Sequence, residues 1–396
     1  MRTKVKLKGG ISLIVLVITI IVMIILAAAI ILSLSNSGII GKANKAKTDS
    51  DAASIKEYAN TLMAEWELMT SAEQEATGCT TNVEYANKKL TEKGYKRELT
   101  ADGKTVMNEA ATAAVKAGIK IGDVVTGYTV TEKSYTTSGE ENTAPNNTET
   151  DPTKQTVTTN TDITWKYLGV NANGELEIMA VLSEKDEIKD TAGKQLKVKL
   201  SGKGGYLKGP DMLNTICEKL YSVSGVGTAR SMNIEDVNNI LGYTGPKGAY
   251  YDNKGNEVKT PTALRIGEIE SKLGTTLATR TTPDGKDLGT YYSDCYDINK
   301  ESDVSKMKNP ENVDLVYNAK NWYWLASPCV GAYFDGSCAE FDVRAVRSIY
   351  VGTLSGFYSF GDSGSSTCAV RPVVKLNTSV KLTKDASNAN TWNITK

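Results

Sequence analysis

The sequence predicts an α+β protein, because segments with strand character outnumber helical ones and long irregular stretches separate them. Apolar runs of strand length occupy 163–182 and 369–376, whereas helical spacing of apolar residues marks 211–222 and 231–243. The stretch 244–300 is irregular and glycine-rich. A compact domain rarely carries loops of that length unless they are functional or disordered.

Composition narrows the functional classes. The 396-residue chain has 46 Lys plus Arg and 46 Asp plus Glu, so it lacks the basic excess that favours nucleic acid. It has no histidine, which excludes Ser-His-Asp and Cys-His nucleophile systems and histidine-ligated metals. Tyrosine (19) far outnumbers phenylalanine (4), and tyrosine suits wet surfaces as well as strand faces. We predict no nucleic-acid partner and no cofactor.

Six cysteines are spread along the chain: Cys79, Cys217, Cys295, Cys329, Cys338 and Cys368. None belongs to a CxxC pair, which argues against zinc. An even number in an exported chain permits disulfides, but the spacing specifies no pairing.

The N-terminal region predicts a membrane anchor. Residues 11–34 are uncharged and apolar on every face, and about 20 apolar residues span a bilayer as a helix. A buried core helix and a removable secretory signal are the alternatives. The run is too long and too uniformly apolar for a typical core helix, and it exceeds the 7–15 apolar residues of a secretory signal. The leader 1–10 is basic, which places it in the cytoplasm and the bulk of the chain outside.

The order of a short basic leader, Gly10, and a long apolar helix that starts Ile-Ser-Leu-Ile resembles the type IV pilin family. The resemblance implies cleavage by a prepilin peptidase after Gly10, a methylated new N-terminus at Ile11, and other pilin subunits as partners. The family has a glutamate at the fifth mature position, where this chain has Val15.

Residues 35–78 are predicted to continue the pilin-like helix. Glycines at 38 and 41 loosen the chain, and the Asp-Ser-Asp sequence at 49–51 provides helix N-cap candidates. The apolar face that follows at 3–4 spacing comprises Ile55, Tyr58, Ala59, Leu62, Trp66 and Met69. An ordinary amphipathic helix shows the same pattern.

The middle of the chain divides into a helical connector at 79–118 and a domain at 119–396. We expect a strand within 119–131 and a flexible polar loop at about 132–160, which has too few bulky apolar residues to order itself. Asn173-Gly174 between two apolar runs indicates a hairpin, and the last residues indicate another.

The helix at 231–243 has Ser231 or Asn233 as its cap, and Asp236 in its first turn suits the helix dipole. Glu235 and Asp236 are therefore interpreted as helix-start acids rather than a catalytic pair. The SGKGGYLKG sequence at 201–209 partly resembles a phosphate-binding loop, but it lacks the GK[ST] ending, so we expect a plain loop there.

Residues 321–376 carry the strongest functional signal. Between NWYWLAS and AVRPVVKL, the sequence is rich in Tyr, Ser, Gly, Asp and Arg, and lacks an obvious helical period. This composition is typical of binding loops, where tyrosine gives rigid contact area and small polar residues give adaptable hydrogen bonds. We expect Trp322 and Trp324 to be core anchors, and Arg371 to make a structural pair.

The WLAS and AVRPVV motifs, after LNTICEKLY and ARSMNIEDVNNILGY, resemble a C-terminal domain of bacterial surface proteins with the C-type-lectin and formylglycine-generating-enzyme fold. The same ending resembles targets of diversity-generating retroelements, which implies a variable region at 328–368. The resemblance implies that these residues bind a ligand: Tyr333, Phe334, Asp335, Ser337, Asp342, Arg344, Arg347, Tyr350, Phe357, Tyr358, Asp362, Ser363 and Ser365.

Two departures limit what the resemblance implies. Cys329 and Cys338 lack the motif that surrounds the enzyme's copper-binding cysteines, and the EPN-like and WND-like calcium motifs of sugar-binding lectins are absent. We therefore predict a non-enzymatic, metal-free protein on the bacterial surface that binds an unknown protein or surface ligand. The alternative is a structural minor pilin whose C-terminal domain packs in a filament.

Overall fold

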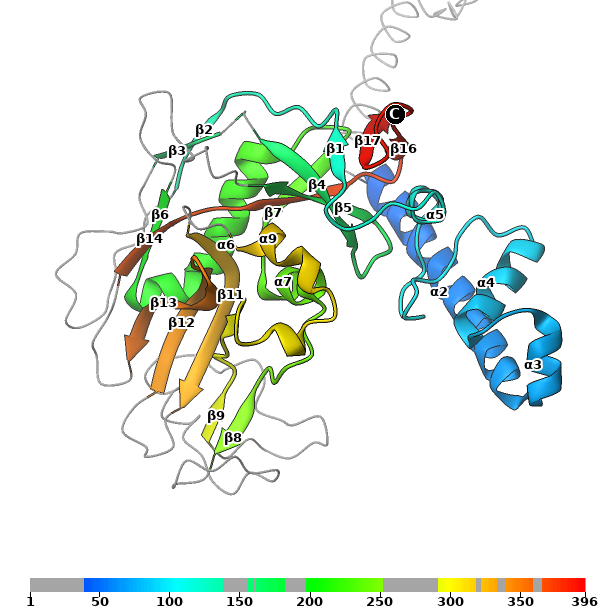
Figure 1. The fold of residues 1–396 in the computed structure, drawn as a ribbon. Coiled ribbons are helices and arrows are strands. Elements are labelled where there is room, and N and C mark those ends of the chain that lie inside the picture. Colours follow the sequence, from blue (N-terminus) through cyan, green and yellow to red (C-terminus); the bar gives the residue numbers. More distant parts are fainter. Residues whose placement is uncertain are drawn as a thin grey trace, which may run out of the picture. The chain divides into compact units, whose positions relative to one another are not determined.

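The computed structural model describes residues 39–137, 156–159, 161, 163–181, 197–251, 291–317, 322–332, 339–358 and 365–395. Within these ranges the protein is a mixed α+β structure, as predicted, with two compact units, Met1–Val106 and Met107–Lys396 (Figure 1). Gly10, Ile11 and the predicted membrane span at 11–34 lie outside the described ranges. Among the helices that the structure does describe, none has the length and apolarity needed to cross a membrane.

Three helices form the described part of the first unit: α2 (Ile39–Leu68), α3 (Ser71–Thr77) and α4 (Asn82–Glu92). The predicted apolar face of α2 is confirmed, since Ile55, Ala59 and Leu62 are buried in one cluster with Tyr85 and Leu90 of α4. Tyr58, Trp66 and Met69 pack against the same cluster from its edge.

The expected helix start at 49–51 is wrong, because α2 runs continuously from Ile39 through these residues. A single interior glycine costs a helix only about 1 kcal/mol relative to alanine, so Gly41 does not break it. The chain turns instead after Leu68. The Thr70 hydroxyl accepts from the Glu73 amide and the Glu73 carboxylate accepts from the Thr70 amide, and this capping box starts α3.

One sheet of the second unit has seven strands. Across the sheet they follow in the order β16 (Lys381–Lys384), β17 (Thr391–Thr395), β1 (Val124–Thr126), β4 (Thr164–Val170), β5 (Leu176–Val181), β15 (Pro372–Leu376) and β7 (Gly227–Ser231). The β4–β5 hairpin is confirmed, with Gly174 at a φ of +76° that suits glycine. The C-terminal hairpin is confirmed as β16–β17.

The second sheet contains the predicted variable region. Its strands follow in the order β10 (Ile298–Asn299), β13 (Tyr350–Tyr358), β12 (Ala339–Val346), β11 (Tyr323–Ala332), β14 (Ser365–Ala369) and β6 (Lys197–Ser201), and β9 (Tyr291–Ser293) joins β11 to β8 (Ala249–Tyr251). Much of 328–368 is thus strand rather than loop. Phe341, Val343 and Val351 are fully buried, and this interleaved apolar series fixes the strands to the core.

The remaining helices of the second unit are α5 (Glu109–Lys116), α6 (Gly202–Tyr221), α7 (Ile234–Leu241) and α9 (Val313–Val316), with 3-10 turns η1 (Val304–Lys306) and η2 (Pro310–Asn312). Helix α6 packs against β7 of the first sheet and against β11 of the second (Figure 1). Asn233 caps α7 and Asp236 lies in its first turn, as predicted.

The plain loop expected at 201–209 is wrong, because α6 starts at Gly202, directly after β6. The glycines allow the helix to approach the strand. A Cβ atom on Gly209 would lie 3.0 Å from Leu200 Cδ1, and one on Gly205 would lie 3.4 Å from Leu200 Cβ. Close packing on the buried Leu200 therefore overrides the low helix propensity of this sequence.

The predicted flexible loop at 132–160 has ordered ends. Strands β2 (Ser134–Thr136) and β3 (Thr156–Thr158) pair antiparallel, and hydroxyl groups of Thr136 and Thr156 lie 2.8 Å apart across them. Val157 is buried in the core of the unit. Cross-strand pairing and one buried apolar side chain are enough to order these ends; residues 138–155 lie outside the described ranges.

Arg371 joins the two sheets where the chain passes from β14 to β15. Its side chain is buried, its Nε donates to the Ala180 carbonyl of β5 at 2.7 Å, and its Nη1 donates to the Tyr323 hydroxyl of β11 at 2.9 Å. The guanidinium also lies over the Tyr323 ring, 5.1 Å from its centroid. The structural role predicted for Arg371 is confirmed.

Candidate binding surface

The predicted ligand residues fall into three groups in the structure. Six of them lie outside the described ranges: Tyr333, Phe334, Asp335, Ser337, Asp362 and Ser363. Three belong to described strands by their backbone, namely Phe357 and Tyr358 in β13 and Ser365 in β14. The remaining four, Asp342, Arg344, Arg347 and Tyr350, have described side chains.

Asp342 and Arg344 of β12 are both 2% exposed. The Arg344 guanidinium donates to the backbone carbonyls of Asp294 and Tyr296 and lies 4.3 Å from the Tyr296 ring centroid. It therefore holds the segment between β9 and β10 against the sheet. Burial of these two side chains is at odds with an exposed ligand face, and the surface described next does not include them.

Arg347 and Tyr350, which are both half-buried, form a cluster with the exposed Trp322. We call this cluster the aromatic–arginine surface. The Arg347 guanidinium lies 5.4 Å from the Trp322 ring centroid and 5.1 Å from the Tyr350 ring centroid. Arg347 Nη1 also donates a hydrogen bond to the Tyr350 hydroxyl. A guanidinium between two aromatic rings is attracted to both ring faces, and each ring restricts the rotamers of the arginine.

The turn between β12 and β13 positions this surface. The Arg347 amide donates to the Tyr350 carbonyl at 2.8 Å, and the Trp322 indole donates to the Ser348 hydroxyl at 3.4 Å. Tyr350 also lies close to Gly352, where a Cβ atom would be 2.7 Å from Tyr350 Cε2. Because Gly352 has no side chain, the Tyr350 ring can lie against the backbone of β13, the strand to which both residues belong. The buried residues of that strand hold this backbone in place.

The expectation that Trp322 and Trp324 are both core anchors holds for one of them. Trp324 is fully buried, and its indole donates to the Val198 carbonyl at 2.7 Å. Trp322 is 45% exposed because it precedes the first residue of β11. Residues two apart in a regular strand lie on the same face, so the sequence alone suggests the same environment for both tryptophans. They differ because β11 begins between them.

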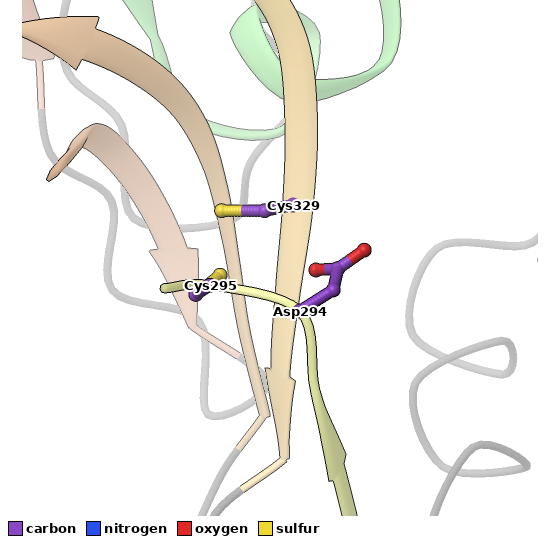
Figure 2. A group of neighbouring side chains, drawn as sticks. All are labelled: Asp294, Cys295 and Cys329. Carbon is purple, nitrogen blue, oxygen red and sulfur yellow. The ribbon is translucent and has the colours of Figure 1, made fainter. Parts of the chain in front are cut away.

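A second polar cluster lies where β11 meets the segment after β9. The side-chain ligand atoms of Asp294, Cys295 and Cys329 all lie within 4.8 Å of one another, and Figure 2 shows the three side chains where the segment after β9 passes β11. Burial raises the pKa of the Asp294 carboxyl. The hydrogen bond between the two thiols, together with burial, raises the pKa of the Cys295 thiol.

The two clusters differ in what they can do. The aromatic–arginine surface offers two amphipathic rings and the donors of a guanidinium, which suit planar, carbohydrate or acidic groups of a ligand. The Asp294–Cys295–Cys329 cluster offers thiols, which suit oxidation or soft metal ions.

Comparison with known proteins adds nothing to this geometry, because no family model, curated protein or solved structure matches the chain.

Proposed function

We propose that this chain is a bacterial surface protein that binds a ligand through the aromatic–arginine surface of a C-type-lectin-like domain. The observation that carries the proposal is the contact of the exposed Trp322 with the half-buried Arg347 and Tyr350, beside the turn that joins two strands of the core. Three large side chains meet there in fixed geometry, although burying them in the core would have favoured folding more.

Tryptophan, tyrosine and arginine are the residues that most often dominate binding energy at interfaces. A pre-positioned stack also loses little conformational entropy when a ligand binds. Trp322 is 45% exposed, and Ile349, which precedes Tyr350 in the sequence, is 39% exposed, so a ligand would cover apolar area that water now contacts. A filament-packing role for the domain would not require an arginine held between two rings.

The membrane anchor completes the proposal. The uncharged run at 11–34 and the basic leader support a single pass with the N-terminus in the cytoplasm, and the pilin-like leader supports processing after Gly10. N-terminal sequencing of the mature protein is expected to begin at Ile11. A mature chain that still begins at Met1 would contradict the pilin-like processing.

Alanine substitution of Trp322 and Tyr350 together tests the binding role. In the detergent-solubilised full chain, we expect the double variant to bind at least about 30-fold more weakly to whichever ligand the wild type retains from a panel of glycans and surface proteins, since loss of one such residue commonly costs about 2 kcal/mol. Its melting temperature should stay within a few degrees of that of the wild type, because Trp322 is exposed and Tyr350 is only half-buried.

Tyr95→Ala is the matched control, because Tyr95 is an exposed tyrosine (40%) in the first unit. It should leave ligand binding unchanged. Undiminished binding by the double variant would refute the role of this surface, and a large fall in its melting temperature would show instead that Trp322 and Tyr350 serve the fold.

A further inference from the structure

The positions of Cys295 and Cys329 follow from the pairing of the segments that carry them. In the β9–β11 pair, Ser293 lies opposite Gly331 in antiparallel register. Because the strands are antiparallel, moving two residues forward from Ser293 and two residues back from Gly331 places Cys295 opposite Cys329. The residues between continue the pairing, because the Asp294 amide donates to the Val330 carbonyl at 3.0 Å.

This pairing also decides how close the two cysteines are. Asp294 and Val330 form the hydrogen-bonded position of the ladder, although the Val330 amide donates to Asp294 Oδ1, at 2.6 Å, and not to a backbone carbonyl. Hydrogen-bonded and non-hydrogen-bonded pairs alternate along an antiparallel ladder, so Cys295 and Cys329 form a non-hydrogen-bonded pair. The side chains of a non-hydrogen-bonded pair lie closer together than those of a hydrogen-bonded pair. The two sulfur atoms accordingly lie within 4.8 Å of each other (Figure 2).

The backbone on both sides of the pair is held. Arg344 binds the carbonyls of Asp294 and Tyr296, which flank Cys295, and Cys329 lies in β11 opposite Asp342 of β12. Disulfide bonds join residues whose Cα atoms lie about 4.4–6.8 Å apart, and the Cα atoms of a non-hydrogen-bonded pair lie about 4.5 Å apart. The cysteines therefore need no rearrangement of the sheet to become bonded.

The surroundings favour the bonded form over separate thiolates. The hydrogen bond with the Cys329 thiol and burial raise the pKa of the Cys295 thiol, and the Asp294 and Asp342 carboxyl groups act in the same direction. A disulfide is neutral and removes both ionisable groups from this site.

We propose that Cys295 and Cys329 form a disulfide bond when the protein meets a disulfide oxidant. One cysteine thiolate attacks the oxidant's disulfide and releases its first thiol, and the other cysteine then attacks the mixed disulfide and releases the second. The two cysteines lose two protons and two electrons, and the oxidant's disulfide is reduced to two thiols. The bond would fasten the segment between β9 and β10 to β11, in the sheet that carries the aromatic–arginine surface.

Peptide mapping of the full wild-type chain tests the proposal without any variant. The detergent-solubilised protein is equilibrated with oxidised glutathione, or with dithiothreitol as the reduced sample, unfolded, alkylated and digested with trypsin. We expect the peptides 287–300 and 321–344 to be linked in the oxidised sample and separate in the reduced one. Cys295 and Cys329 that are both alkylated after oxidation would overturn the proposal.

Because peptide 321–344 also contains Cys338, two variants assign the bond. The link should persist in Cys338→Ser and disappear in Cys329→Ser, and the reverse result would overturn the pairing. Oxidation should raise the melting temperature of the wild type by about 5 °C and leave that of Cys295→Ser unchanged. Protection of both thiols that a chelator reverses, but a reductant does not, would identify a metal site and overturn the disulfide.

Discussion

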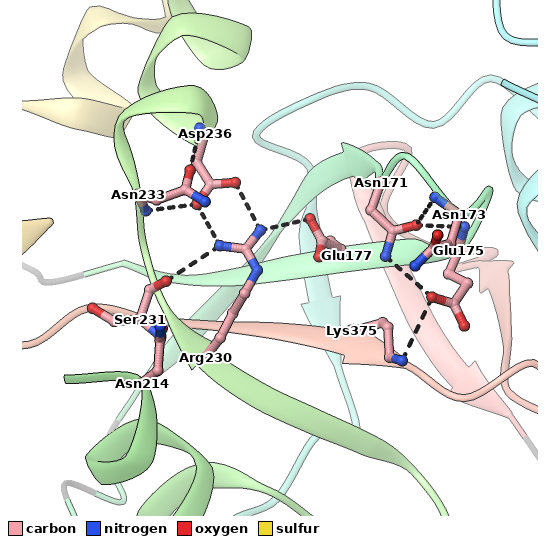
Figure 3. A network of polar contacts seen from close by, with 10 residues as sticks. All are labelled: Asn171, Asn173, Glu175, Glu177, Asn214, Arg230, Ser231, Asn233, Asp236 and Lys375. Atoms are coloured by element: carbon pink, nitrogen blue, oxygen red, sulfur yellow. Dashed lines mark hydrogen bonds and ion pairs between the residues drawn. The ribbon is translucent and has the colours of Figure 1, made fainter. Parts of the chain in front are cut away.

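Replacing Arg230 with alanine is expected to destabilise the second unit by about 3–5 kcal/mol, because it leaves two buried carboxylates without their cation. Arg230 donates to both oxygens of Asp236, at 2.6 and 2.8 Å, and to Glu177 at 3.0 Å (Figure 3). Glu177 and Asp236 are 6% and 5% exposed. Denaturant unfolding of the full chain, followed by a signal from the second unit, measures the loss.

The pH dependence distinguishes lost charge pairing from lost packing. Burial already raises the pKa of Glu177, and the Arg230 charge opposes that rise. Without Arg230 the pKa of Glu177 should rise further, so the carboxyl becomes neutral at a higher pH. The difference in unfolding free energy between variant and wild type should therefore shrink as the pH is lowered from neutral. A difference that stays constant with pH would contradict this account.

A matched control comes from a nearby surface pair. Lys375 Nζ and Glu175 lie 3.6 Å apart, and the Lys375 side chain is 37% exposed (Figure 3). The Glu175 side chain is 15% exposed, but it also accepts a hydrogen bond from the Asn171 amide at 3.2 Å, so it keeps a partner without Lys375. Ion pairs with one well-exposed partner contribute about 0–1 kcal/mol. Lys375→Ala should therefore have a small effect under the conditions in which Arg230→Ala has a large one.

Trp324→Ala is expected to cost about 3–5 kcal/mol, because it opens a cavity in the core between the two sheets. Trp324 is fully buried, and its indole is also the donor to the Val198 carbonyl of β6. The substitution removes that donor as well as the ring. Thermal or denaturant unfolding of the full chain measures the effect.

Trp322→Ala provides the comparison, since the same change two residues earlier removes a ring that is 45% exposed. It should change the unfolding free energy by less than about 0.5 kcal/mol, which is usual for surface positions. Equal losses for the two variants would contradict the assignment of Trp324 to the core and of Trp322 to the surface.

Features that depend on local sequence could be predicted. Asn173-Gly174 forms its hairpin because glycine reaches the positive φ that the turn needs, and Asn233 caps α7 through its own side chain. The apolar face of α2 follows from helical periodicity. Each of these signals lies within a few residues of its consequence.

Features that depend on distant contacts could not be predicted. The helix at 202–209 exists because two glycines pack on Leu200, and the burial of Arg344 depends on carbonyls at 294 and 296, far away in the sequence. The family resemblance placed Arg344 among the ligand-binding residues, and a buried and an exposed arginine look alike in a sequence. The pairing of Cys295 with Cys329 likewise requires the strand register.

Fluorine NMR of the full chain labelled with 5-fluorotryptophan tests most directly whether the aromatic–arginine surface binds ligand. The Trp322 resonance is assigned from its loss in Trp322→Phe, and the ligand retained from the panel of glycans and surface proteins is then titrated. We expect the Trp322 resonance to shift with saturation, while those of the fully buried Trp324 and Trp392 stay in place. A ligand that saturates the protein and leaves the Trp322 resonance unchanged would contradict the account.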